Sequence, residues 1–160
     1  MYADLGFYLT RDHVSAAPVC LLLAGIRKWL ERANPICLMH PLGFYVVLLG
    51  RNETEEWRFH FWPKGARSIV GIPARIHTHD RHVESRILQG KLTNIIYDMA
   101  EVPIGGQPLY EVSYGGDRYA AVTSNILRQT TTRVEAIIRR RDVIGRGEMY
   151  HVERHAYHEA

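Results

Sequence analysis

The chain has 160 residues, of which 46% are hydrophobic and 23% are charged, and its formal net charge is +3 at pH 7. This composition is typical of one globular domain that buries roughly two-thirds of its unfolded surface. The small net charge does not indicate a nucleic-acid partner, and no apolar run approaches the roughly 20 residues that a membrane-spanning helix needs. We therefore expect residues 1–160 to form a single domain in the cytoplasm.

The first part of the chain predicts a helix. Residues 15–35 carry apolar side chains close to the i, i+3, i+4, i+7 pattern of an amphipathic helix. We expect Ser15 to cap its N-terminus, and Asn34 to end it together with the proline that follows. Residues 1–35 are thus expected to form an N-terminal α-helical segment. The two cysteines have apolar neighbours and no paired spacing, which favours buried free thiols at Cys20 and Cys37.

From residue 36 onward the hydrophobic period changes to two, which predicts β-strands. The cleanest alternation is "WRFHFW" at residues 57–62, where Arg58, His60 and Trp62 share one face. A run of three arginines at 139–141 is expected at the exposed end of a strand that enters a turn. Many short strands separated by glycine-containing turns indicate a β-sandwich or barrel over 36–160. The other expected strands are 43–50, 74–79, 85–90, 92–99, 109–114, 118–123, 130–138 and 147–153.

Histidines gather in two clusters, one of which is "GIPARIHTHDRHVESRILQG" at residues 71–90. On a strand, residues i and i+2 point to the same face, so His77 and His79 can converge on one ion at about 2.0–2.1 Å. A pair cannot hold a metal alone, and another strand has to supply a third ligand. A single H-x-H would favour surface or core histidines, whereas a second cluster at residues 151–158 favours a metal site.

Residues 71–90 resemble the first motif of the cupin family, G-x5-H-x-H-x(3,4)-E-x6-G. The fixed positions of that motif are held by Gly71, His77, His79, Glu84 and Gly90. The second cupin motif, G-x5-P-x-G-x2-H-x3-N, fits from Gly147 by spacing and places His158 at its histidine. Its proline and glycine positions hold Glu153 and His155, which predicts a different turn there, and its asparagine position lies beyond the last residue.

The resemblance covers roughly residues 40–160 and implies an all-β fold of the cupin type. That fold is a double-stranded β-helix, or jelly-roll barrel, in which the two motifs lie on neighbouring strands and their histidines face the interior. It implies that His77, His79 and His158 bind one metal ion and leave two or three coordination positions open.

The motif does not decide whether a fourth residue binds the metal, or which residue it would be. In the shorter form of the motif the carboxylate follows the second histidine by four residues, but Glu84 follows His79 by five and is one step out of strand register. A bulge would be needed to turn it toward the metal. His82 is the alternative, and with neither residue bound the site would resemble the three-histidine iron centre of the thiol dioxygenases, which are cupins.

By this resemblance the chain is expected to be a metal-dependent enzyme, a non-haem Fe(II) dioxygenase for a small amino-acid-like or carboxylate substrate. Zinc, nickel, manganese and copper remain open as metals. Arg58, with His60 beside it, is the expected carboxylate-binding residue, against the alternative of a solvent-facing arginine. The alternative functions are a redox-neutral isomerase or lyase and a non-catalytic metal- or ligand-binding cupin.

The chain ends two residues after His158, whereas cupin barrels usually continue for further strands. Either the N-terminal strands complete the barrel, a partner chain completes it, or the sequence is a fragment. Unpaired strand edges need protection, so we expect a homodimer.

Overall fold

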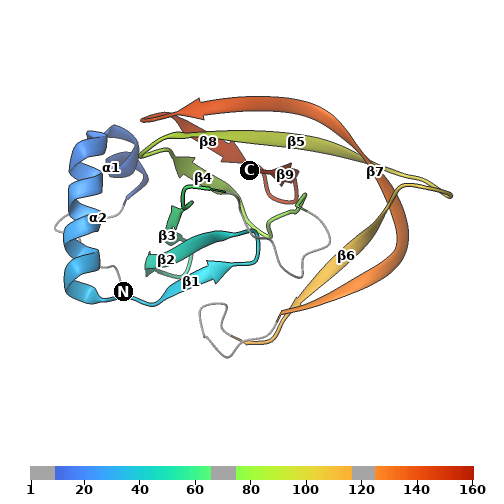
Figure 1. Ribbon diagram of the computed structural model, residues 1–160, viewed down its shortest axis with the longest axis horizontal. Helices are drawn as coiled ribbons and strands as arrows, with labels where there is room; N and C mark the ends of the chain where they lie inside the picture. The colour runs from blue at the N-terminus through green and yellow to red at the C-terminus, as the bar shows by residue number, and fades with distance from the viewer. Residues whose placement is uncertain (1–9, 66–74, 117–124) are drawn as a thin grey trace. The chain divides into compact units, whose positions relative to one another are not determined.

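The structure is a computed structural model that describes residues 10–65, 75–116 and 125–160, and it is mostly β-strand in antiparallel sheets (Figure 1). The chain forms two compact units. The first comprises Met1–Arg75, Val83–Leu92 and Val143–His151, and the second comprises Ile76–His82, Thr93–Asp142 and Val152–Ala160. The chain passes between the two units several times. The expectation of a single domain over residues 1–160 stays a prediction. Along the described ranges, no helix has the length and apolarity to cross a membrane.

The N-terminal segment forms two helices where one was expected, α1 (Arg11–Ala16) and α2 (Val19–Ala33). The backbone between them is extended, with ψ angles of 143° at Ala17 and 133° at Pro18. A proline forces the residue before it out of the helical region, so Pro18 separates the helices instead of opening one.

The helix caps correct one expectation and confirm another. Ser15 lies inside α1, and the N-cap of α1 is Thr10, whose hydroxyl accepts a hydrogen bond from the His13 amide at 3.2 Å. A serine or threonine caps a helix only where its own backbone is extended, as at Thr10, which has a φ of −123° and a ψ of 156°. Asn34 ends α2 as expected, in the left-handed conformation with φ of 41°.

The first unit packs α2 against a three-stranded sheet with the order β1-β2-β3. Ile26 of the helix contacts Val47 and Leu49 in the buried core of this unit, and the aromatic residues Trp57 and Phe59 pack around them. The core against the helix thus takes alternate residues of β2 and β3, as the sequence predicts, although Phe44 and Val46 on the other face of β2 are buried as well. The strands are β1 (Cys37–His40), β2 (Phe44–Arg51) and β3 (Glu56–Phe61).

The expectation of buried cysteines is wrong, because Cys20 and Cys37 are both exposed. Cys20 lies on α2 away from the buried stripe formed by Leu22 and Ile26. Cys37 begins β1, an edge strand whose burial alternates and leaves its first residue in solvent. Apolar neighbours in the sequence therefore do not determine whether a cysteine lies on the buried or the exposed face of its helix or strand.

A separate pair of strands joins β4 (Val83–Arg86) to β8 (Met149–Val152). Arg86 ends β4 and donates hydrogen bonds to the carbonyls of Val14 at 2.6 Å and Ala17 at 2.7 Å. These contacts tie β4 to the end of α1 within the first unit. The expected strand at 85–90 is therefore shorter and begins earlier.

The second unit is built on a four-stranded antiparallel sheet with the order β6-β7-β5-β9. Its longest strand pairs with a neighbour on each side, so the ladder continues through the arginines at 139–141. Those arginines lie inside that strand, and their expected place at a strand end is wrong. The expected strand at 118–123 lies outside the described residues. The strands are β5 (Lys91–Glu101), β6 (Gln107–Tyr114), β7 (Asn125–Gly145) and β9 (Tyr157–Glu159).

Candidate metal centre

The candidate metal centre starts from the backbone of β9, which is only three residues long. One edge of this strand pairs with β5, where Ile96 faces His158. On its other edge, His77 and His158 exchange two backbone hydrogen bonds, each 2.9 Å long. Over the described residues 75–79 the expected strand is reduced to this one bridge, because β9 is only three residues long, and residue 74 lies outside the described residues. That bridge nevertheless brings the two histidine clusters together.

His79 is held by the turn that precedes β9. The backbone amide of His155 donates to the carbonyl of His79 at 2.9 Å. His155 has a φ of 64°, in the left-handed region that non-glycine residues rarely adopt. His77 and His79 are therefore both held by main-chain contacts to the last residues of the chain.

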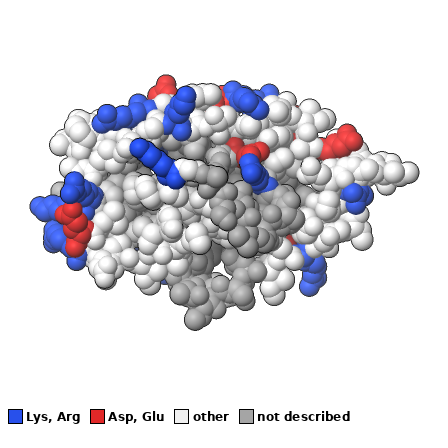
Figure 2. Space-filling view, viewed as in Figure 1, with Lys and Arg blue, Asp and Glu red and all other residues white. Residues whose placement is uncertain are grey.

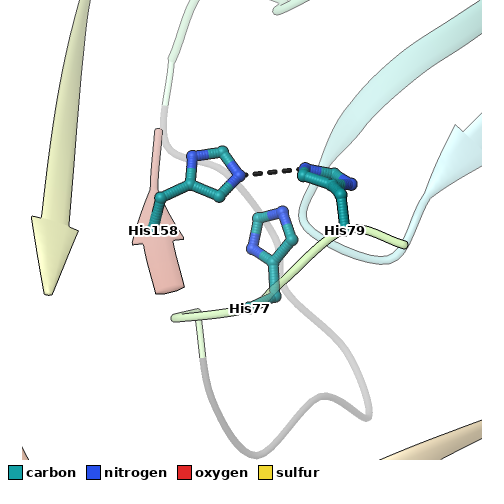
Figure 3. A group of neighbouring side chains, drawn as sticks. All are labelled: His77, His79 and His158. Carbon is teal, nitrogen blue, oxygen red and sulfur yellow. Dashed lines mark hydrogen bonds between the residues drawn. The ribbon is translucent and has the colours of Figure 1, made fainter. Parts of the chain in front are cut away.

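The three rings point into a common space, as Figure 3 shows for His77, His79 and His158. Their centroids lie 4.5 Å apart for His77 and His158, 4.9 Å for His77 and His79, and 5.0 Å for His79 and His158. One ligand atom from each ring lies within 4.8 Å of the others. The three histidines expected from the sequence form a group that could hold a metal ion.

The spacing of two donor atoms fits an ion closely. The Nε2 atoms of His79 and His158 are 2.9 Å apart. Two nitrogens about 2.0–2.1 Å from one ion would be about 2.9 Å apart at a right angle and about 3.4 Å apart at the tetrahedral angle. The same 2.9 Å suits a hydrogen bond between one protonated and one bare nitrogen when no ion is bound.

Burial keeps the central histidine neutral. His158 is only 4% exposed. Desolvation lowers its pKa from the ordinary 6.5 to about 3, and repulsion from His77 and then His79 acts in the same direction. At pH 7 the His158 ring is therefore uncharged and has a lone pair free for a metal.

A fourth side chain, which the sequence reasoning missed, contacts this group. Asn94 is 0% exposed, and its Oδ1 lies 2.9 Å from Nδ1 of His158. Its Nδ2 is also buried and has no hydrogen-bond partner among the described residues. A signal was present in the sequence, because Leu92, Asn94 and Ile96 alternate onto the same face of the strand and the asparagine stands between two apolar residues.

The two candidate fourth ligands make other contacts. Glu84 lies on β4 in the first unit, where its carboxylate forms an ion pair with Arg11. His82 is exposed, and its Nδ1 lies 3.0 Å from a carboxylate oxygen of Glu153. Metal ligation by Glu84 or His82 stays a prediction.

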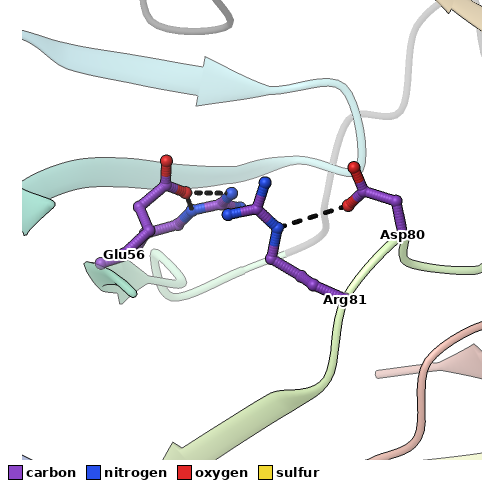
Figure 4. Close-up of polar contacts among 4 residues, drawn as sticks. Glu56, Asp80 and Arg81 are labelled. Atoms are coloured by element: carbon purple, nitrogen blue, oxygen red, sulfur yellow. Dashed lines mark hydrogen bonds and ion pairs between the residues drawn. The ribbon is translucent and has the colours of Figure 1, made fainter. Parts of the chain in front are cut away.

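The expected substrate residues lie on β3 in the first unit. The Arg58 guanidinium pairs with the carboxylate of Glu56, which is labelled in Figure 4, and its Nε lies 2.5 Å from that carboxylate. The His60 ring packs at 5.1 Å from Phe44 and 5.8 Å from Trp62. The contact with Trp62 agrees with a shared strand face, and substrate binding by Arg58 and His60 stays a prediction.

Figure 4 also shows a second ion pair, which belongs to the second unit. The Arg81 Nε lies 3.4 Å from the carboxylate of Asp80. Asp80 directly follows His79 in sequence, and its charge is matched by this neighbour.

Comparisons of the chain with protein-family models, curated proteins and solved structures found no match.

Proposed function

We propose that this protein is a metal-dependent cupin in which His77, His79 and His158 bind one divalent transition-metal ion. The observation that carries the proposal is the convergence of three imidazoles from two distant clusters, with two Nε2 atoms 2.9 Å apart. Neutral imidazoles are good ligands for iron, zinc, nickel and copper, and the low pKa of His158 keeps it in that form at pH 7.

Two further observations support the cupin jelly roll. The backbone bridge between His77 and His158 makes the two motif segments neighbours, as in that fold. The glycine position of the second motif is held by His155, whose φ of 64° is a conformation that glycine adopts without strain. A turn with this backbone conformation favours glycine, which is the residue that the cupin motif has at this position, whereas this chain has His155.

Three neutral ligands leave the charge of a divalent ion uncompensated, so the centre should attract anionic groups. When bound, the ion would supply a Lewis acid and, if it is iron, a redox centre for dioxygen. We therefore propose a non-haem Fe(II) dioxygenase that acts on a small amino-acid-like or carboxylate substrate. Arg58 would hold the carboxylate in a paired geometry, and this substrate group would have to compete with Glu56 for the guanidinium.

Metal content and oxygen consumption test this function together. We expect protein purified without added metal and loaded anaerobically with Fe(II) to hold one iron per chain. We also expect it to consume O₂ with a cysteine-like thiol or a small carboxylic acid. The matched control is the same protein loaded with Zn(II), which cannot reduce O₂.

A different outcome would identify one of the alternatives. Tight zinc binding and no O₂ uptake across the panel of thiols and acids would contradict the dioxygenase. That result would favour a redox-neutral isomerase or lyase, or a non-catalytic metal-binding cupin. Absence of stoichiometric binding for iron, zinc, nickel, manganese and copper would contradict the metal site itself.

We also propose that the protein is a cytoplasmic homodimer. The proposal depends on the cupin resemblance, because members of that family often pair through edge strands. Light scattering at micromolar concentration is expected to give twice the chain mass of 18.4 kDa, and a monomer under those conditions would contradict it.

A further inference from the structure

The contact between Asn94 and His158 is fixed by the sheet. Ile96 on β5 faces His158 on β9, and Asn94 lies two residues before Ile96 on the same face of β5. It is therefore the diagonal neighbour of His158, within reach of its side chain. Both side chains are buried, and the Asn94 Oδ1 lies 2.9 Å from Nδ1 of His158.

This contact determines which ring nitrogen of His158 carries the proton. A neutral imidazole has one N–H and one lone pair. With the Asn94 carbonyl oxygen against Nδ1, that nitrogen donates the hydrogen bond, and Nε2 is left with the lone pair. Nε2 is the atom that faces Nε2 of His79 at 2.9 Å. The reverse orientation of the amide would place an N–H group against Nδ1 and put the ring proton on Nε2, where it would block a metal.

We infer that Asn94 is a positioning residue of the metal centre, which holds His158 in the tautomer and ring orientation that leave its Nε2 free for the ion. The inference rests on the proposed metal site. Histidine ligands commonly donate their second N–H to a carboxylate, a carbonyl or a water, and here the acceptor is a neutral amide. An amide orients the ring without adding negative charge, so it preserves the uncompensated charge that would attract anionic ligands.

A role in filling space alone would leave one observation unexplained. The Nδ2 of Asn94 is buried without a hydrogen-bond partner in the described part of the chain, which typically costs about 1–3 kcal/mol. Leucine would avoid that cost but would leave the buried Nδ1–H of His158 without an acceptor. The amide at this position is therefore explained by the bond that its oxygen makes to the His158 ring.

The first test reads the tautomer directly and requires no metal. Long-range ¹H–¹⁵N spectra of the metal-free protein distinguish a protonated Nδ1 from a protonated Nε2, and the signals of His158 are assigned by their loss in His158→Asn. We expect the Nδ1–H form. The Nε2–H form in a protein that binds metal would overturn the inference about Asn94 and leave the proposed metal site standing.

The second test compares Asn94→Leu with Asn94→Asp. Leucine has a similar volume but no acceptor, and we expect it to weaken Co(II) and Zn(II) binding about 10–100-fold in a chelator competition. Aspartate restores an acceptor, so Asn94→Asp should regain most of the affinity. It should also shift the visible spectrum of bound Co(II), which a change in stability alone would not do.

The outcomes separate the two proposals. An Asn94→Leu variant that unfolds at the wild-type urea concentration and binds both metals within about twofold of wild type would overturn the inference. If that variant does not fold, the inference is tested by the His158 tautomer in the wild-type protein and by the visible spectrum of Co(II) bound to Asn94→Asp. Wild-type protein that shows the Nδ1–H form but binds neither metal would refute the metal site and the role of Asn94 in it.

Discussion

Replacing His77 by alanine is expected to lower the affinity for a divalent metal by more than about 100-fold. Loss of a residue that only orients a metal ligand already lowers metal affinity about 10–100-fold. His77 would be one of three protein ligands, so its loss should lower the affinity further. His77 is a better position for this substitution than His158, because His158 is only 4% exposed. Its replacement by alanine would leave a cavity and would leave the Asn94 carbonyl without a hydrogen-bond donor. Chelator competition and elemental analysis of the purified variant measure the effect.

The control is His13→Ala, which removes a histidine of α1 in the first unit that belongs to neither group of possible metal ligands, and it should leave metal affinity unchanged. Glu84→Gln and His82→Ala complete the series. A loss of affinity of more than about tenfold in either variant would identify the fourth ligand, and wild-type affinity in both would identify a three-histidine centre. Stoichiometric metal in His77→Ala would refute the site.

The spacing of the histidines carried most of the information about the site. The sequence indicates His77 and His79 because alternate residues of a strand point to the same side. It indicates His158 because this residue stands eleven residues after Gly147, as in the second cupin motif. The structure brings these three together without the continuous strand that was expected around the first two. Two main-chain contacts to the last residues suffice, and such contacts depend on a partner segment that no local pattern reveals.

Asn94 shows what a pattern of residue types leaves out. An asparagine within an apolar strand is compatible with an exposed face, a bulge or a buried contact, and only the pairing of Ile96 with His158 decides among them. The same reason explains the arginines at 139–141, because a strand ends where its neighbours stop pairing. Sequence periodicity thus predicted the faces of the strands better than their ends.

The free energy of unfolding of the metal-free protein is expected to fall by about 2 kcal/mol between pH 7 and pH 5 because of His158. Its pKa is about 3 in the folded chain, whereas the ordinary value of 6.5 applies when the chain is unfolded. Between these two pH values the unfolded chain binds a proton that the folded chain does not, so lowering the pH favours unfolding. Each pH unit across this window contributes about 1.4 kcal/mol at most.

Urea unfolding of the metal-free wild type and of His158→Asn at both pH values isolates this contribution. Asparagine keeps an N–H donor near the position of Nδ1, so it can still bond to Asn94, but it does not titrate. The variant should therefore lose about 2 kcal/mol less stability than the wild type between pH 7 and pH 5. Equal losses in the two proteins would show that His158 is protonated equally in the folded and unfolded chains. Its ring would then be open to water, and the dry, neutral ligand on which the metal centre depends would not exist.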